Sequence, residues 1–386
     1  MPTYTRQSVA FKAGEGCWLI DEDGNRYLDA LSGISVCNIG HANPHIGKEI
    51  SQQASQLLHT SNLYRIPLQE KLASRLCTMS GLDTVFFCNS GAEANEAAIK
   101  ICRKSANDRG MDDALIVVMR GSFHGRTMAT LSATGNEKVQ QGFAPLLQGF
   151  HHIPYNDLEA LEALTTGSLN IIAVMLEPVQ GEGGVVVPDK GYLQSVRKLC
   201  SEQDWLMVVD EVQTGMCRTG QWFACQHEQV VPDVMTIAKS LGNGVPIGAC
   251  LANAEAGEVL SAGTHGSTFG GNPLSARAAL AVIEYMSSND IAKKATRLGE
   301  RIRADFERNL GEVKEVRDIR NLGLMIGIQL DRDCADLVGL ALDRKLLINV
   351  TAGNVIRLLP PLIMNDEELN LIVQTVSDLI KEYLKE

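Results

Sequence analysis

Two polar residues stand at the carboxyl ends of apolar runs, where they could act on a bound small molecule. Asp210 follows residues 206–209, and Lys239 follows residues 234–238. Runs that are apolar throughout predict strands buried on both faces of a parallel sheet, and open α/β sheets bind ligands at such strand ends. Burial also disfavours the ammonium form of a lysine and frees its amine as a nucleophile. Taken singly, each residue is equally well explained as a charge that reaches solvent from a strand end.

Together, Asp210 and Lys239 predict a cofactor that stores electrons. Pyridoxal phosphate forms a Schiff base with a lysine, and it accepts electrons while its ring nitrogen stays protonated. A carboxylate held against that nitrogen keeps the proton in place. Because two consecutive strand ends can present both groups into one crevice, we expect Lys239 and Asp210 to hold this cofactor.

A helix start at residue 90 could bind the phosphate of such a cofactor. Ser90 is a typical N-cap residue, and Glu93 completes the spacing of a capping box. Free amides at a helix N-terminus bind anions, and Gly91 lets the ligand approach the backbone closely. An ordinary capped helix would show the same pattern, so this helix start indicates a phosphate site only in combination with Asp210 and Lys239.

Strands and helices alternate along the middle of the chain, which is typical of a doubly wound α/β domain. The predicted strands are residues 85–88, 115–119, 171–176, 206–209, 234–237 and 249–252. Helices are predicted between them, for example at residues 92–103 and 191–203. A hairpin that turns at Asp23-Gly24 is predicted near the start, and helices at 272–288, 291–308 and 366–384 are predicted near the end. We expect residues 1–45 to join a small α/β domain at residues 276–386, with residues 46–275 forming the large cofactor-binding domain.

Composition excludes several classes of function. The net charge of −11 over 386 residues argues against a nucleic-acid or membrane partner, and no apolar run reaches the length of a membrane span.

The ten cysteines are scattered singly, which favours a reducing compartment and buried, inert thiols. No targeting pattern is visible at the N-terminus, so we expect a cytoplasmic protein. Walker, dinucleotide-binding, HExxH and nucleophile-elbow motifs are absent, and no metal site is expected.

Six segments, in the same order along the chain, resemble the class-III aminotransferases. They are residues 90–96 (SGAEANE), 122–127 (SFHGRT), 177–184 (EPVQGEGG), 210–213 (DEVQ), 238–239 (AK) and 267–273 (STFGGNP). The resemblance runs from about residue 5 to the C-terminus. Residues 33–36 (GISV), 40–41 (GH) and 61–64 (SNLY) further resemble the acetylornithine aminotransferases within that family.

This resemblance implies an aspartate-aminotransferase-like fold, pyridoxal-phosphate fold type I, and a role for each matching residue. Lys239 carries the Schiff base and shuttles the proton, while Asp210 pairs with the ring nitrogen. The other implied cofactor contacts are Val212 and Phe123 on the two ring faces, Gln213 near the ring hydroxyl, Gly91 and Ala92 at the phosphate, and Thr268 of the partner subunit, also at the phosphate. The active site would therefore need a homodimer.

The resemblance also implies how two substrates share one site. Arginine reads a carboxylate with two parallel hydrogen bonds. Arg126 would bind the α-carboxylate of an amino donor, and Arg357 would bind that of the acceptor, 2-oxoglutarate. Glu182 would pair with Arg357 when the acceptor is absent, and Ser267 would contact the substrate. A surface salt bridge for Arg126 and a strand-edge charge for Arg357 are the ordinary alternatives.

The implied reaction moves the terminal amino group of N-acetylornithine to 2-oxoglutarate, as in arginine biosynthesis. Ornithine, succinylornithine, N-succinyl-diaminopimelate and 4-aminobutyrate stay open as donors, because the sequence does not show how much room an acyl group has. A decarboxylase or an aminomutase could use the same scaffold. A non-catalytic binding protein would not need both Lys239 and Asp210.

Overall fold

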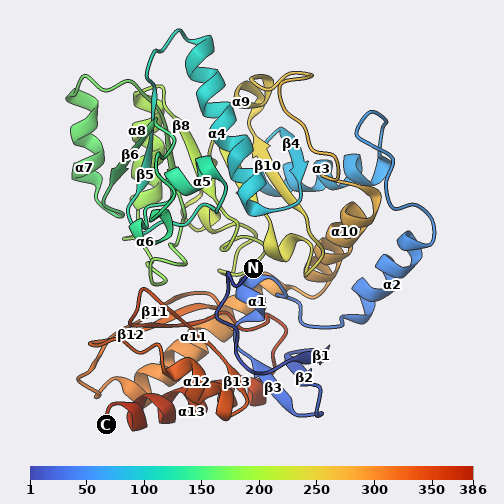
Figure 1. Cartoon of the computed structure of the whole chain (residues 1–386), viewed down its shortest axis with the longest axis vertical. Coiled ribbons are helices and arrows are strands. Elements are labelled where there is room, and N and C mark those ends of the chain that lie inside the picture. Colours follow the sequence, from blue (N-terminus) through green and yellow to red (C-terminus); the bar gives the residue numbers. More distant parts are fainter. Residues whose placement is uncertain (386) are drawn as a thin grey trace.

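A computed structural model describes residues 1–385, and its largest element is a sheet of seven strands (Figure 1). The strands are β4 (Thr84–Cys88), β5 (Leu115–Met119), β6 (Phe150–Ile153), β7 (Ile171–Leu176), β8 (Leu206–Asp210), β9 (Val234–Ile237) and β10 (Gly248–Ala252). Their order across the sheet is β4-β10-β9-β8-β7-β5-β6. All pairs from β9 to β6 are parallel, whereas β10 is antiparallel to both of its neighbours. The expectation of a mostly parallel α/β sheet is confirmed.

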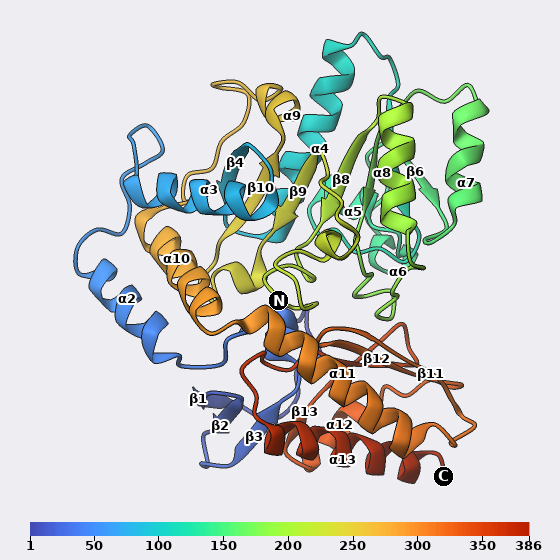
Figure 2. The same ribbon diagram turned by 180° about the vertical axis from the view of Figure 1, so that it is seen from behind.

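Both faces of this sheet are covered by helices, as Figures 1 and 2 show. In β5, Val117 and Met119 enter one hydrophobic cluster, and Ile116 and Val118 enter another. Because successive side chains point to opposite faces, both sets leave water only when both faces are covered. This is why the central strands are apolar throughout instead of alternating.

Several of the helices around the large sheet begin at a side-chain cap. Ser90 accepts the amide of Glu93 ahead of the first long helix, and Asn272 accepts the amide of Ser275 ahead of the last one. The helices are α2 (Pro44–Ala54), α3 (Pro67–Ser80), α4 (Gly91–Asp108), α5 (Met128–Ala133), α6 (Glu137–Gln140), α7 (Leu158–Ala163), α8 (Tyr192–Glu202), α9 (Ala254–Glu258) and α10 (Pro273–Ser288). Short 3-10 turns are η1 (Leu164–Thr166), η2 (Ala224–Glu228) and η3 (Lys239–Leu241).

The two ends of the chain lie together in a smaller part below the large sheet (Figure 1). One sheet there has the order β1-β2-β3-β13, and the other has the order β11-β12-β15-β14. The strands are β1 (Phe11–Glu15), β2 (Trp18–Asp21), β3 (Arg26–Asp29), β11 (Val316–Leu322), β12 (Met325–Leu330), β13 (Leu346–Leu347), β14 (Asn349–Thr351) and β15 (Val355–Leu358). The helices are α11 (Ile291–Leu310), α12 (Leu337–Asp343) and α13 (Asp366–Tyr383).

N-terminal and C-terminal chain share one of these sheets. β13 pairs in parallel with β3, with Leu346 opposite Leu28. β2 and β3 form the expected hairpin, and Gly24 turns it with φ at +89°. The division at residues 45 and 275 stays a prediction, which this pairing of the two chain ends supports.

A left-handed turn joins the N-terminal segment to the large sheet. Ser32, Gly33, Ile34 and Ser35, which make up α1 (Ser32–Ser35), have φ of 52°, 62°, 66° and 60°. Such backbone costs about 1–2 kcal/mol for each residue other than glycine, so the surroundings must hold it in place.

Buried hydrogen bonds fix this turn. Ser35 Oγ donates to the carbonyl of Gln213 at 3.1 Å. Arg218 is fully buried and donates to Ser35 Oγ and to the carbonyls of Leu324 and Pro360. Burial lowers the pKa of Arg218 to about 9. The arginine thus fastens three segments of the chain that approach the site.

All ten cysteines in the described chain are free thiols, and eight of them are buried. No helix within residues 1–385 has the length and apolar character that crossing a bilayer would need. No cluster of metal-ligating side chains occurs among the same residues.

Candidate active site

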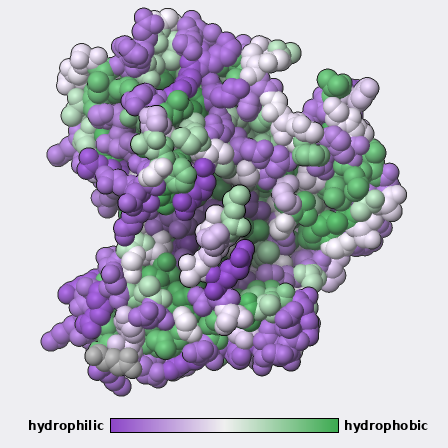
Figure 3. Space-filling model, in the orientation of Figure 1, coloured by the Kyte–Doolittle hydropathy of each residue, from purple (hydrophilic) through white to green (hydrophobic). Residues whose placement is uncertain are grey.

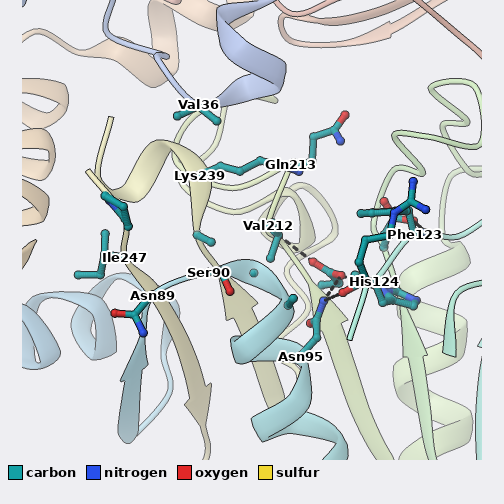
Figure 4. A pocket seen from close by; sticks show the side chains of 18 of the residues that line it. Val36, Asn89, Ser90, Asn95, Phe123, His124, Val212, Gln213, Lys239 and Ile247 are labelled. Carbon is teal, nitrogen blue, oxygen red and sulfur yellow. Dashed lines mark hydrogen bonds and ion pairs between the residues drawn. The ribbon is translucent and has the colours of Figure 1, made fainter. Parts of the chain in front are cut away.

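A cavity of about 370 Å³ lies at the carboxyl ends of the parallel strands. A recess between the upper and lower parts of the molecule is visible in Figure 3. Asp210 at the end of β8, Glu177 after β7 and Lys239 after β9 all line the cavity. Figure 4 shows Lys239 there, beside Gln213 and Val212. The predicted meeting of Asp210 and Lys239 in one crevice is therefore what the fold provides.

Lys239 is held in strained backbone with its amine directed into this cavity. Its φ is +44°, in the left-handed region that residues other than glycine rarely adopt. Its Nζ makes no hydrogen bond or ion pair within residues 1–385. Burial lowers the pKa of Lys239, although the carboxylates of Asp210 and Glu182 oppose this effect. An unpartnered amine with a lowered pKa is suited to nucleophilic attack on a carbonyl carbon.

Asp210 is held by a buried polar network. Its Oδ2 accepts from Asn95 Nδ2 at 2.7 Å and lies 2.8 Å from His124 Nδ1, and its Oδ1 accepts the amide of Val212 at 3.0 Å. Thr236 Oγ1 donates to Asn95 Oδ1 at 2.6 Å, which fixes the orientation of that amide. Burial alone would lower the pKa of His124, but the hydrogen bond to Asp210 raises it. The carboxylate is thus held in one orientation by Asn95, His124 and the amide of Val212.

The start of α4 offers an anion site beside Asp210. The amides of Gly91 and Ala92 occupy the first two helical positions and find no acceptor within the described chain. A Cβ on Gly91 would lie 2.7 Å from Val212 Cγ1, so only glycine fits there. The unpaired amides and the helix dipole suit a phosphate group.

Two side chains border the space between the amine and the carboxylate. Figure 4 shows Val212 on one side and Phe123 on the other, and both line the cavity. A flat aromatic ring would stack on Phe123 and pack against Val212. The amine, the carboxylate, the anion site and these two walls together fit a phosphorylated pyridine cofactor.

Arg357 lies in a polar cage near the cavity. Its side chain is 1% exposed, and its Nη1 lies 2.6 Å from Glu182 Oε1 and 3.3 Å from Gln213 Oε1. Its Nη2 donates to Asn349 Oδ1 at 2.7 Å. Glu182 is 32% exposed, so this carboxylate can leave Arg357 for solvent without crossing packed protein.

Arg126 lies at the mouth of the same cavity and is exposed. Its guanidinium carbon is 5.5 Å from the centroid of the Phe123 ring. It forms no ion pair within residues 1–385, so its donors are free for a carboxylate from outside. The predicted surface salt bridge, the alternative for this residue, is not formed.

A family model decides the relationship that this geometry suggests. The model described as aminotransferase class-III matches residues 2–380. The chain belongs to this family. Class-III aminotransferases depend on pyridoxal phosphate, so the cofactor expected from Lys239 and Asp210 is confirmed.

Individual relatives of this class-III aminotransferase are named for two different activities. The acetylornithine aminotransferase of Nitrosomonas europaea is 52% identical over 100% of this chain and 98% of its own length. The crystal structure of the ornithine aminotransferase from Toxoplasma gondii has a TM-score of 0.96 at 35% identity, covering 100% of this chain and 93% of the other. The acetylornithine aminotransferase from Elizabethkingia anophelis has a TM-score of 0.88 at 34% identity, covering 99% and 96%.

Ser267 and Thr268 lie outside the cavity of this single class-III chain. Both belong to the segment between α9 and α10, where Ser267 Oγ accepts the amide of Gly270 at 3.0 Å and Thr268 is exposed. Asn89 Nδ2 donates to Ser267 Oγ at 3.4 Å, which holds the segment near the start of α4. The substrate contact of Ser267 and the role of Thr268 at a partner's cofactor phosphate stay predictions.

Sequence reasoning missed four polar residues of this site. They are Asn95, His124, Glu177 and Asn349. Asn95, His124 and Glu177 lie inside segments that resemble the family, but nothing local shows that Asn95 and His124 bond to Asp210, at separations of 115 and 86 residues. Asn349 stands in a short strand with no motif around it. Only the folded sheets bring these partners together.

Proposed function

We propose that this aminotransferase moves the terminal amino group of N-acetylornithine to 2-oxoglutarate, giving N-acetylglutamate semialdehyde and glutamate in arginine biosynthesis. The observation that carries the proposal is the contrast between Arg357, caged by Glu182, and Arg126, which is free. Two carboxylate readers in one site suit two substrates that enter in turn. The donor is inferred from the 52% identical relative, an acetylornithine aminotransferase.

Pyridoxal phosphate, when bound, supplies a carbonyl carbon that takes up the amino group and a ring that takes up electrons. Lys239 Nζ is placed to hold the cofactor and then to move the proton at the substrate carbon. Asp210, held by His124 and Asn95, keeps a carboxylate against the ring nitrogen. The remaining contacts proposed are the amides of Gly91 and Ala92 at the phosphate, Phe123 and Val212 on the ring faces, and Gln213 near the ring hydroxyl.

The arginines and Glu182 are proposed to sort the two substrates. Arg126 binds the α-carboxylate of the amino donor, which leaves the far amine near Lys239. Meanwhile Glu182 neutralises Arg357, so the donor does not bind there with its α-carboxylate. When 2-oxoglutarate enters, its α-carboxylate takes the place of Glu182 on Arg357, and Ser267 contributes a substrate contact.

A homodimer would complete the site, with Thr268 of the partner subunit at the phosphate. Large apolar side chains are exposed in two neighbouring loops, at Leu57, Leu58, Leu63, Tyr64 and Phe269. Asn62 Nδ2 donates to the carbonyls of Ser267 and Gly270, so the two loops form one surface. This surface supports a partner subunit there. We also propose a cytoplasmic location, because the unpaired cysteines favour a reducing compartment.

Ornithine is the second candidate donor, because the Toxoplasma gondii ornithine aminotransferase has a TM-score of 0.96. A TM-score reports the path of the backbone, whereas a donor is chosen by a few side chains. We therefore give more weight to the 52% identity with an acetylornithine aminotransferase over the whole chain.

The visible absorbance spectrum tests the proposal directly. The purified protein is expected to be yellow, to bleach when N-acetylornithine is added, and to recover its colour with 2-oxoglutarate. Faster bleaching with ornithine or 4-aminobutyrate would replace the donor. A colourless protein that pyridoxal phosphate does not reconstitute would contradict the assignment of Lys239.

A further inference from the structure

Glu177 is a buried carboxylate of the cavity with no assigned role. It follows β7 directly, is 4% exposed and lines the cavity. No lysine or arginine within residues 1–385 forms an ion pair with it. Burying a carboxylate without a cation in contact is costly, so hydrogen bonds from its surroundings must stabilise the charge instead.

Both oxygens of Glu177 accept backbone amides, and the two amides come from different loops. Oε2 accepts the amide of Phe123 at 3.0 Å, and Oε1 accepts the amide of Gly181 at 3.2 Å. Phe123 provides one wall of the cofactor space. Gly181 directly precedes Glu182, the partner of Arg357.

The loop at Gly181 lies directly against the side chain of Gln213. A Cβ on Gly181 would meet Gln213 Oε1 at 2.3 Å, so the two cannot move independently without one giving way. Gln213 in turn accepts from Arg357 at 3.3 Å. A shift of the Gly181 amide would therefore change how Glu182 and Gln213 meet Arg357.

We propose that Glu177 is a positioning residue that ties the cofactor wall at Phe123 to the substrate switch at Glu182, through two hydrogen bonds that need its ionised form. A carboxylate accepts with both oxygens, whereas a glutamine presents an NH2 donor on one side, and a protonated carboxyl accepts more weakly through its hydroxyl oxygen. Losing the charge would therefore weaken one of the two amide contacts, and the glutamine would leave that amide facing a donor. This inference rests on the proposed function for Glu182 but not on the identity of the donor.

The charge of Glu177 changes within the range of ordinary assays. Burial raises the pKa of Glu177 to about 7, against the opposing effect of His124. The charged and titratable groups that face it are His124 after β5, Tyr155 after β6, Asp210 on β8 and Lys239 after β9. An acid with a raised pKa is ionised above that pKa and protonated below it. The two amide contacts are thus complete above neutral pH and weakened as the pH falls through about 7.

The experiment compares Glu177→Gln with Glu177→Asp and with a matched control, Glu211→Gln. Glu211 is also a buried glutamate at a strand end, and it accepts the amide of Cys225 at 2.8 Å, but it does not line the cavity. Each purified protein is stripped of cofactor and titrated with pyridoxal phosphate across the pH range. Each holoenzyme is then mixed separately with the amino donor and, after conversion, with 2-oxoglutarate.

Glu177→Gln is expected to lower kcat/KM for the donor about tenfold, because one charge-assisted hydrogen bond is lost. The loss for 2-oxoglutarate is smaller, because Glu182 leaves Arg357 in that half-reaction. The dissociation constant of pyridoxal phosphate rises, and its dependence on pH near 7 disappears. Glu177→Asp keeps a carboxylate and keeps the pH dependence, and Glu211→Gln changes stability without changing either profile.

Two outcomes separate this inference from the proposed function. If N-acetylornithine does not bleach the wild type while Glu177→Gln alters cofactor binding as described, the assignment of the donor is wrong and the positioning role of Glu177 stands. If Glu177→Gln matches the wild type in cofactor affinity, in pH profile and in the ratio of the two substrates, the inference is overturned. An equal loss for both substrates with an unchanged pH profile would also overturn it.

Discussion

The two arginines proposed to read substrate carboxylates differ in how much protein surrounds them. Arg357 is 1% exposed and already bound to Glu182 and Asn349, whereas Arg126 is exposed and stacks on Phe123. Water can satisfy Arg126 when no substrate is bound. A buried guanidinium cannot be left without a partner at similar cost, because desolvation of an unpaired charge is severe.

This difference explains why only one of the arginines has an internal carboxylate. In the proposed function Glu182 takes the place of a substrate carboxylate at Arg357, and its 32% exposure would let it turn to solvent when the substrate binds. Arg126 needs no such substitute. A site with two equally open arginines would bind a donor with one carboxylate in either direction, so burial and pairing supply the discrimination.

The largest effect is expected at Lys239, the amine that both arginines would serve. Lys239→Ala should lower turnover by at least about a thousandfold, because the nucleophile and proton carrier are lost together. Circular dichroism should show an intact fold, since no hydrogen bond of the described chain depends on this amine. Retained transaminase activity in a clean preparation would show that the arginines serve another reacting group.

Arg357→Ala should be the next most damaging change. We expect kcat/KM for 2-oxoglutarate to fall about a hundredfold, because removing one partner of a buried charge pair costs several kcal/mol. The donor half-reaction should suffer less. Single-turnover absorbance changes with each substrate measure the two effects separately. Arg344→Ala, which breaks a surface pair with Glu382, is the control and should leave both half-reactions unchanged.

Arg126→Ala should lower kcat/KM for the amino donor more than kcat/KM for 2-oxoglutarate, and its effect should be smaller than that of Arg357→Ala. Its exposed guanidinium is expected to contribute about tenfold to kcat/KM for the amino donor. The loss for 2-oxoglutarate should be smaller. Arg126→Lys keeps the charge but not the two parallel hydrogen bonds, so it should lie between wild type and alanine. Equal losses for both substrates would remove the proposed division between the two arginines.

The sequence predicted the parts of the site that depend on local pattern. The strands that end at Asp210 and before Lys239 were recognisable because both faces of the sheet are covered, which leaves continuous apolar runs. The capped start of α4 was recognisable because N-caps are local. β6 (Phe150–Ile153) was missed, since Phe150, His151 and His152 are only partly buried and its run is mixed.

Contacts between distant segments were beyond such patterns. Whether His124 touches Asp210, or Glu177 touches two loops, depends on the order of strands across the sheet. No single segment of the sequence determines the order of the parallel strands. The resemblance to the family supplied Arg357 and Glu182, but the strength of their cage, with Asn349 as a third member, required the structure.

Asn349 offers the finest test of the comparison between the arginines. It is the neutral partner of Nη2, with Oδ1 accepting at 2.7 Å, and it would stay on Arg357 together with Gln213 if Glu182 left as proposed. Asn349→Ala should lower kcat/KM for 2-oxoglutarate about threefold, the effect of one ordinary hydrogen bond, because Arg357 would be aimed less well. Arg126 and the donor half-reaction should be unaffected.

Asn349→Asp would change the charge of the cage instead of its geometry. A second carboxylate beside Arg357 could not leave as Glu182 does, because Asn349 lies within β14. It would compete with the α-carboxylate of 2-oxoglutarate and weaken that substrate more than Asn349→Ala does. Equal losses in Asn349→Asp and Asn349→Ala would show that a carboxylate beside Arg357 does not compete with 2-oxoglutarate. The burial of Arg357, and not its pairing with Glu182, would then have to explain why it differs from Arg126.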